Sequence, residues 1–252
     1  MKRMNNLIKY ELKSLSRNGF NWAFAIVMPC VLYYLICLSV LESVPNQIFN
    51  QVKIEIFLGF STVIPLAGVL LGNAATYSKE YEEGVPKRMM LFGISKKDTI
   101  ISKLVSQIVF IIVAIAIYTI FAITVGLQID NFLLFPVMLA LLIIQGMVEF
   151  ILAYSIVNIF KKFGPTFAIS MGIYFFIFIV SGNMGIKADQ LPKALAFIGE
   201  KMLPFVEFTK FNTNLVLGNS LNYKMLIMTN LSFAIIVFLI YFVSKLINKR
   251  MN

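Results

Sequence analysis

Hydrophobic residues along the chain gather into six long runs that are separated by polar segments. The runs cover Phe20–Leu41, Ile56–Tyr77, Leu104–Gly126, Phe132–Val157, Phe167–Asn183 and Met225–Ile247. A helix needs about 20 apolar residues to cross a bilayer, and all runs except Phe167–Asn183 meet that length. The runs are continuous and do not alternate with polar residues, which favours helices over the strands of a membrane barrel. The pattern therefore predicts an all-α integral membrane protein with six transmembrane helices.

Residues 1–19 carry an amphipathic pattern instead of a continuous apolar run. The apolar positions on one helix face are Met4, Leu7, Ile8, Leu12 and Leu15, and the opposite face holds Lys9, Lys13, Ser16 and Arg17. A helix with two such faces lies along the membrane surface. We therefore expect an interfacial helix over residues 1–19 and a single six-helix domain over residues 20–252, with Pro29 kinking the first span.

The distribution of charge predicts which side of the membrane each segment faces. Charged residues make up 13% of the 252 residues, and the net charge is +10. Soluble domains carry about 25% charged residues. All but six of the 22 Lys and Arg residues fall in segments 1–19, 78–103, 158–166 and 244–252. Because short basic loops stay in the cytoplasm, both termini are expected there. We interpret the basic excess as a topology signal and an anionic-lipid contact, with no nucleic-acid surface.

The polar loop at residues 78–103 mixes charges of both signs and carries signals for one short helix. Pro86 suits the first turn of a helix, and the acidic residues just before it favour the positive end of that helix. Gly93 would end the helix, and Ser95 would cap the next one. Apolar residues 89–92 lie between these caps, which favours docking of a soluble partner over a solvated linker. The loop therefore predicts a rigid, two-faced knob between two membrane helices.

The segment 184–224, which this topology places outside, is also amphipathic. Apolar residues at helical spacing lie on both sides of Pro204; they are Leu191, Ala194, Leu195, Ile198 and Met202, then Phe205, Val206, Phe208 and Phe211. A pair of short re-entrant helices that dip into the outer leaflet fits this pattern. A folded surface loop is the alternative.

Few polar side chains lie inside the runs. Glu149 is an acid deep in a span, and Gln145 lies one turn before it on the same face. An intramembrane carboxylate is costly and faces the bundle interior or a watery cavity, so Glu149 could be structural, contact a substrate or carry a proton. Gly68 and Gly72, followed by Asn73, predict close helix packing in the second span. Gln145, Glu149 and Asn73 are our candidates for a polar pathway.

Catalytic chemistry finds little support in the sequence. The chain has no His and two Cys, and its acids show no metal-ligand spacing, so no metal site is expected. It contains neither a serine elbow nor a phosphate-binding G-x-x-x-x-G-K-[ST] loop. We therefore expect no enzyme and no cofactor within this chain.

Several short motifs resemble those of type-2 ABC exporter permeases. The stretch Glu80-Tyr81-Glu82-Glu83-Gly84-Val85, with Leu91, Gly93-Ile94-Ser95 and Lys103, is similar to that family's cytoplasmic loop. Glu11-Leu12, Arg17-Asn18 and Pro29 resemble its N-terminal region, and Leu203-Pro204-Phe205 resembles its last outer loop. The number of spans and the cytoplasmic termini match as well.

The resemblance implies a coupling helix that sits in a groove of a separate ABC ATPase. The residues expected at that contact are Glu80, Glu82, Glu83, Gly84, Lys87, Arg88 and Met89. It also implies two ATPase copies that bind ATP and Mg²⁺, a second permease copy in a homodimer or heterodimer, and re-entrant outer helices that close the exit.

The substrate is inferred from composition and similarity. The 24 Phe and 13 Met residues favour an adaptable apolar pathway for amphipathic peptides. The size and composition resemble permeases of staphylococcal exporters for phenol-soluble modulins, which implies export of peptide toxins from a Gram-positive cell. The alternatives are an ion-coupled transporter that uses Glu149, a stand-alone peptide-immunity membrane protein, and an ABC exporter of drugs or lipid-linked glycans.

Overall fold

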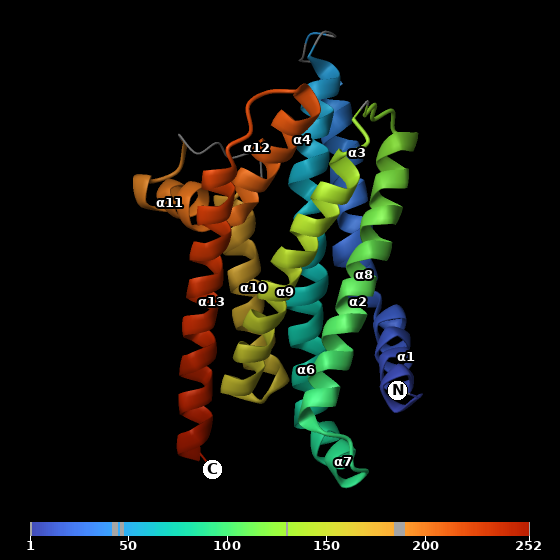
Figure 1. Cartoon of the computed structure of the whole chain (residues 1–252), viewed down its shortest axis with the longest axis vertical. Coiled ribbons are helices and arrows are strands. Elements are labelled where there is room, and N and C mark those ends of the chain that lie inside the picture. Colours follow the sequence, from blue (N-terminus) through green and yellow to red (C-terminus); the bar gives the residue numbers. More distant parts are fainter. Residues whose placement is uncertain (1, 42–44, 46–47, 130, 184–189, 252) are drawn as a thin grey trace.

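The chain folds into a bundle of long helices that run along one axis (Figure 1). The computed structural model describes residues 2–41, 45, 48–129, 131–183 and 190–251, and the regular structure within them is helical. Six helical segments are long and apolar enough to cross a membrane: Gly19–Ser39, Phe49–Glu82, Lys96–Thr124, Leu134–Phe160, Phe163–Val180 and Tyr223–Lys249. Within the described ranges, the prediction of six membrane-crossing helices is therefore confirmed.

Several span boundaries differ from the hydrophobic pattern. The second span begins at Phe49 and the third at Lys96, well before their apolar runs, because backbone hydrogen bonding continues through polar turns. The predicted fifth span, Phe167–Asn183, is shifted toward the N-terminus and forms α10 (Phe163–Val180). The shift has a local cause: Gly182 adopts a φ of 77° and turns the chain just after α10.

The first span is assembled from several short pieces. The N-terminal helix α1 (Lys2–Arg17) is followed by α2 (Gly19–Trp22), the π-helical turn η1 (Ala23–Val27) and α3 (Met28–Leu41). Asn18 separates α1 from α2, and its Oδ1 accepts a hydrogen bond from the Phe20 N–H at 3.1 Å. Pro29, the predicted position of a kink, is the second residue of α3 and lies two positions after the end of η1. Since Pro29 lacks an N–H, the π-helical turn accommodates the carbonyl that loses its partner.

The second span lies at the centre of the bundle. It comprises α4 (Phe49–Ser61), α5 (Val63–Pro65), the π-helical turn η2 (Leu66–Leu71) and α6 (Gly72–Glu82). Its most apolar stretch is 83% buried, whereas the other five spans reach at most 39%. The remaining spans are α8 (Lys96–Thr124), α9 (Leu134–Phe160), α10 and α13 (Tyr223–Met251). They pack around this central rod and leave their outer faces apolar and exposed.

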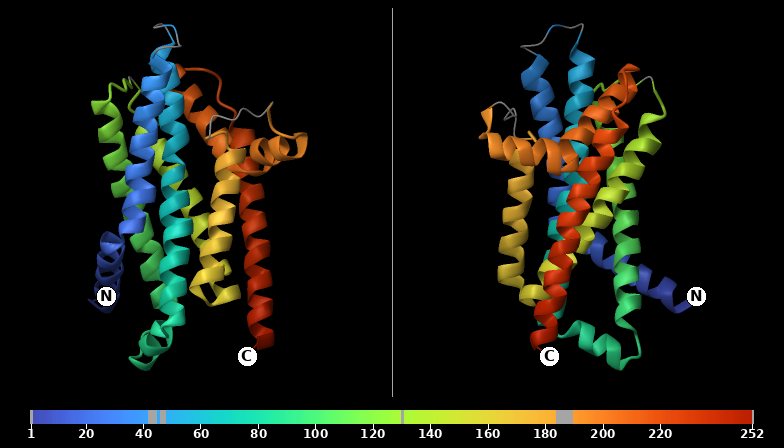
Figure 2. Two further views of the ribbon diagram at one scale, coloured as in Figure 1. Left: turned by 180° about the vertical axis from the view of Figure 1, so that it is seen from behind. Right: turned by 60° about the vertical axis from the view of Figure 1, so that its left-hand side comes forward.

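The short helices gather at the two ends of the bundle. The helix α7 (Val85–Leu91), α1 and the C-terminal end of α13 lie toward one end (Figures 1 and 2). At the opposite end, α11 (Lys193–Phe197) and η4 (Ile198–Met202) run across the spans, and α12 (Pro204–Leu217) follows (Figure 2). Two short helical units therefore fill the described part of segment 184–224; residues 184–189 lie outside the described ranges. Re-entry into a leaflet and the cytoplasmic side of the α7 end stay predictions.

Gly68 and Gly72 lie on the surfaces of the second span that touch neighbouring helices. A Cβ at Gly68 would approach the Phe110 ring on α8 at 2.5 Å, and a Cβ at Gly72 would overlap the side chain of Asn21. Asn21 is fully buried in α2. These glycines therefore bring the second span close to the first and third spans of the same chain.

Replacing Gly72 by Ala is expected to lower the free energy of unfolding by about 1–3 kcal/mol, because Asn21 must move within a packed core. Gly172→Ala is the matched control, since Gly172 lies in a helix and a Cβ there has open space. That control is expected to be neutral or to stabilise the protein by up to about 1 kcal/mol. Thermal unfolding of both purified variants measures the difference, and equal shifts would contradict the packing role of Gly72.

Candidate functional site

The helix α7 begins at a glycine in a backbone conformation that other residues rarely adopt. Gly84 precedes α7 with a φ of 73°, which a residue with a Cβ reaches only at a cost. Pro86 lies in the first turn of α7, where its missing N–H removes no helical hydrogen bond. The chain therefore changes direction sharply between α6 and α7, as the glycine and proline predict.

A second glycine turn joins α7 to α8. Gly93 has a φ of 72°, and its N–H donates to the Met90 carbonyl at 2.9 Å. The Ile94 N–H donates to the Met89 carbonyl at 3.0 Å, which completes the turn. Ser95 Oγ then accepts from the Asp98 N–H at 3.0 Å and caps α8. Both connections of α7 are thus short and hydrogen-bonded.

The outward face of α7 exposes large apolar side chains. Leu91 is 85% exposed and Phe92 is 80% exposed, while Lys87 and Arg88 are exposed on the same short segment. These residues lie outside the membrane-crossing apolar runs, at the end of the bundle shown at the bottom of Figure 1. An exposed apolar pair rimmed by basic residues is typical of a protein–protein contact.

The three acids before α7 take three different positions. Glu80 Oε2 lies 2.8 Å from Lys103 Nζ and points into the protein. Glu82 Oε2 accepts a hydrogen bond from the Phe163 N–H at 3.1 Å and so caps α10. Glu83 is exposed, and its carbonyl accepts from Arg88 Nη2 at 3.1 Å. Glu82 and Glu83 are both exposed, and Glu83 is the one of the two whose carboxylate takes part in none of the hydrogen bonds and ion pairs found in the described chain.

The inward side of α7 rests on α8. Met89 Sδ lies 3.9 Å from the Thr99 hydroxyl, which donates a weak hydrogen bond to it. A cavity of about 130 Å³ remains behind the helix, and Lys87 lies at its edge. Met89 therefore faces α8, whereas the apolar side chains that point outward follow it in the chain.

A buried ion-pair cluster lies directly behind this end of the protein. Lys103 Nζ on α8 lies 2.9 Å from Glu11 Oε2 on α1 and 2.8 Å from Glu80 Oε2 on α6. The side chains of Lys103, Glu11 and Glu80 are 5%, 4% and 14% exposed. The cluster therefore joins α1 to the two helices that flank α7.

Polar atoms around the cluster extend its contact with α1. Asn73, Gln107 and Thr76 surround a small cavity that also touches Glu11 and Lys103. Ser106 Oγ donates to the Ile8 carbonyl at 3.3 Å, and Arg3 Nη2 donates to the Phe92 carbonyl at 2.9 Å. Helix α1 thus contacts both α8 and the turn that follows α7.

The buried cluster holds two carboxylates and one ammonium. Burial has the largest effect on the pKa of Glu11. Removal of Glu11 from water raises the pKa of its carboxyl; the Lys103 ammonium lowers this pKa, and the Glu80 carboxylate raises it further. The net direction is upward from the ordinary value of 4.5. The ionised form of Glu11 is therefore less favoured in the folded protein than in the unfolded chain.

Glu11→Gln is expected to remove a pH-dependent loss of stability. Because the folded-state pKa of Glu11 is raised, its contribution is fully present below pH 4.5 and is lost as pH rises through that raised pKa. At neutral pH the variant should therefore unfold at the same or a higher temperature than the wild type. Thermal unfolding across a pH series measures this, with exposed Glu83→Gln as the control. A variant that loses stability at neutral pH would contradict the expectation.

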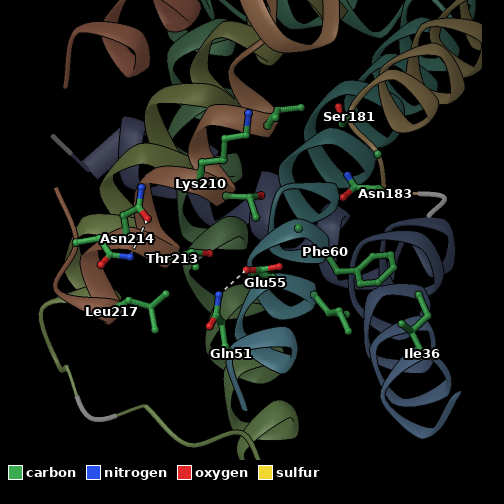
Figure 3. Close-up of a pocket in the computed structure, with 16 residues that line it drawn as sticks. Ile36, Gln51, Glu55, Phe60, Ser181, Asn183, Lys210, Thr213, Asn214 and Leu217 are labelled. Atoms are coloured by element: carbon green, nitrogen blue, oxygen red, sulfur yellow. Dashed lines mark hydrogen bonds between the residues drawn. The ribbon is translucent and has the colours of Figure 1, made fainter. Parts of the chain in front are cut away.

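A larger cavity opens at the opposite end of the bundle (Figure 3). Its volume is about 570 Å³, and it lies between α4, the end of α10 and α12. The wall is mixed: Ile36, Phe60 and Leu217 are apolar, whereas Glu55 and Lys210 carry charge. Gln51 Nε2 donates to Glu55 Oε1 at 3.3 Å within this wall. The volume falls within the about 300–1,000 Å³ range of ligand pockets.

The intramembrane polar candidates do not meet at one site. Glu149 is fully buried on α9, and its Oε1 accepts a hydrogen bond from Gln145 Nε2 at 3.2 Å. Neither Gln145 nor Glu149 lines the cavity beside α12, the small cavity beside Lys103 or the cavity behind α7. Asn73 lies instead beside the Glu11–Lys103 cluster. Gln145 and Glu149 thus form an interior pair within one chain.

Sequence reasoning missed the Glu11–Lys103 pair as a site. Its signal was present: Glu11 falls between Leu7 and Leu15 on the buried face of α1, and Lys103 lies at the edge of an apolar run. A buried charge needs a partner of opposite sign, but the two residues are 92 positions apart. The apolar pattern of α1 omitted Glu11, and no local spacing rule links the pair.

The fold defines a multi-pass membrane protein with the short helix α7 at one end of the bundle. The ABC-2 type transporter family matches residues 3–206, and the chain belongs to this family. Its membrane domain is the permease component of an ABC transporter, works with a separate ABC ATPase and lies in the bacterial plasma membrane. Comparison with curated proteins and with solved structures gives no match.

Proposed function

We propose that this chain is the permease subunit of an ATP-driven exporter that moves amphipathic or hydrophobic substrates out of a Gram-positive cell. Peptides such as cytolytic toxins or bacteriocins are the favoured substrate class. The observation that carries the proposal is α7, a short helix between two glycine turns with Leu91 and Phe92 exposed. In this reading α7 is the coupling helix and docks in a groove of the ATPase.

The chemistry of α7 supports such a groove. Phe92 and Leu91 would enter an apolar depression, and Lys87 and Arg88 would pair with acidic side chains at its rim. Aromatic and Arg side chains are enriched among the residues that dominate binding energy at interfaces. Glu83 would add one acid at the same contact, whereas Glu80 and Glu82 would act from behind by holding α6 to α8 and α10.

The ion-pair cluster supports transmission of movement from α7 to the membrane. Lys103 binds Glu80 at the end of the second span and lies itself near the start of the third span. Force on α7 would therefore reach both spans together and also α1 through Glu11. Short capped connections transmit such movement because they have little slack.

Two copies of the permease and two ATPases that bind ATP and Mg²⁺ would form the exporter. The mixed apolar and polar cavity at the opposite end supports an amphipathic substrate near the exit, beside α12. In this reading α11, η4 and α12 are the outer helices that close the pathway.

The proposal is tested by purifying the permease with a C-terminal tag from its own host and identifying bound proteins by mass spectrometry. The expected result is an ABC ATPase with a phosphate-binding loop, and ATP hydrolysis by the complex that rises with an amphipathic helical peptide. Peptide transport that follows a proton gradient without ATP would overturn the proposal. Protection against a toxin without any ATPase would also overturn it and favour an immunity protein.

Glu149→Gln separates the ATP-driven reading from an ion-coupled transporter. Because Glu149 is buried and bonded to Gln145, an amide of the same shape should keep both packing and hydrogen bonding. We expect unchanged ATP hydrolysis and transport within about twofold, because the amide oxygen can still accept from Gln145 and the second oxygen of Glu149 has no hydrogen-bond partner among the described residues to lose. Transport assays in vesicles with and without a proton gradient measure this, and complete loss of gradient-driven transport would favour the ion-coupled alternative.

A further inference from the structure

A cavity of about 240 Å³ lies at the α7 end of the bundle, between α6, α8, α9 and α13. Three lysines from three separate elements line it. Lys96 is the first residue of α8, Lys161 follows α9, and Lys245 lies in the last turns of α13. Lys161 adopts a φ of 55°, an uncommon value for a residue with a Cβ.

The charges in this cavity all have one sign. The other lining residues are uncharged: Tyr81, Tyr154, Asn158, Tyr241, Ser244 and Asn248. In the described part of the chain, the ion pairs belong to Lys103 and Lys210, and none involves Lys96, Lys161 or Lys245. Three ammonium groups around one hollow repel one another, and an anion between them would remove that repulsion.

The neutral wall is fixed by bonds of its own. Asn248 Nδ2 donates to the Asn158 carbonyl at 3.1 Å and to the Ser244 carbonyl at 3.2 Å, which ties α13 to α9. Lys96 Nζ lies 5.9 Å from the centre of the Tyr154 ring. The Tyr154 and Tyr241 rings lie 6.4 Å apart, and both line the cavity. Hydrogen bonds and ring contacts therefore hold together the helices that carry the lysines.

We propose that this cavity is a binding site for a phosphate group, supplied by the headgroup of an anionic phospholipid. Lysine binds phosphate as a point charge, and basic pockets between membrane helices on the cytoplasmic side hold lipid headgroups. The volume is below the about 300 Å³ at which pockets for drug-sized ligands begin, which suits a headgroup better than a nucleotide. Phe242 and Leu246, which flank Lys245, are 59% and 63% exposed and offer an apolar surface to acyl chains.

Binding here would join the start of α8 to α9 and α13. Lys96 lies five positions beyond Leu91, the last residue of α7. The bound phosphate would thus hold the start of α8 against α9 and α13 and would leave the exposed face of α7 free. Free inorganic phosphate offers the same chemistry, so the test must separate these two sources.

The test uses the purified full-length chain, stripped of lipid in detergent and examined by native mass spectrometry. The probes are dioctanoyl phosphatidylglycerol, dioctanoyl phosphatidylcholine and inorganic phosphate at constant ionic strength. The site variant carries Lys96→Gln, Lys161→Gln and Lys245→Gln. The control variant carries Lys97→Gln, Lys162→Gln and Lys249→Gln, which remove equal charge from neighbouring positions that do not line the cavity.

We expect wild type and control to retain phosphatidylglycerol, and the site variant to bind it at least about tenfold more weakly, since charge-assisted contacts are lost. Phosphatidylcholine should bind weakly to all three proteins. Inorganic phosphate that binds with the same lysine dependence and displaces the lipid would support the site with a free anion as its source. Equal loss in both variants, or no loss in the site variant, would overturn the proposal. The single variant Lys245→Gln gives the same comparison against Lys249→Gln if the triple variant does not fold.

Discussion

Replacing Lys103 by Met is expected to lower the free energy of unfolding by about 3–5 kcal/mol, because it leaves two carboxylates buried without a counter-charge. Glu11 and Glu80 both lie within 2.9 Å of the Lys103 ammonium in the folded protein. Met is unbranched and matches the aliphatic part of the Lys side chain, so the loss reports mainly the removed charge. The change should appear as a large drop in the unfolding temperature of the purified protein in detergent.

The control for this experiment is Lys97→Met. Lys97 is exposed in the first turn of the same helix, so its removal should shift stability by less than about 0.5 kcal/mol. The double variant Lys103→Met with Glu11→Gln should recover part of the loss, because one buried carboxylate is removed. Equal stability of the Lys103→Met protein and the wild type would show that the ion-pair cluster does not contribute to the free energy of unfolding.

Replacing Leu91 and Phe92 by Ser is expected to abolish stable association with the ATPase. Each side chain is more than three-quarters exposed, so truncation should leave the fold of the permease unchanged. Buried anchors at interfaces contribute about 2 kcal/mol or more each, which corresponds to about a 30-fold loss of affinity per residue. Binding of the purified permease to its co-purified ATPase, measured on an immobilised surface, gives the affinity.

Phe132 and Leu133 provide the matched control for this second prediction. They are 79% and 64% exposed. They lie just before α9, at the end of the bundle opposite α7 (Figure 1). Serine at these two positions should leave ATPase binding within about twofold, because they lie far from the proposed contact. Comparable losses at both ends would mean that exposed apolar surface acts through general stability, and the assignment of α7 as the docking helix would fail.

The membrane-crossing helices could be predicted because a bilayer imposes one local requirement on each of them. Backbone groups in lipid must be bonded within the segment, so a long apolar run already implies a helix. The residues at which the spans begin and end cannot be predicted from this requirement. The second span continues to Glu82 through polar residues, and the fifth is set by the Phe163 cap and by Gly182, which hydropathy does not register. The π-helical turns η1 and η2 likewise leave no trace in an apolar run.

Some features of the candidate site also follow from local sequence, whereas others depend on how the helices pack. Gly84, Pro86 and Gly93 act on their own backbone, so the position of α7 follows from sequence. The directions of the three acids do not, because the partner of Glu80 lies on α8 and that of Glu82 lies at the start of α10. The lysine-lined cavity is also invisible to local reasoning, since its three charges come together only when α8, α9 and α13 pack.

The distance along the chain between Glu11 and Lys103 has a consequence for biogenesis. Helix α1 leaves the ribosome with Glu11 unpaired, and its partner follows 92 residues later. Until the third span has been made, Lys103 is absent and Glu11 has no ion-pair partner on that span. We therefore expect α1 to pack against α8 late, after the first three spans have inserted into the membrane.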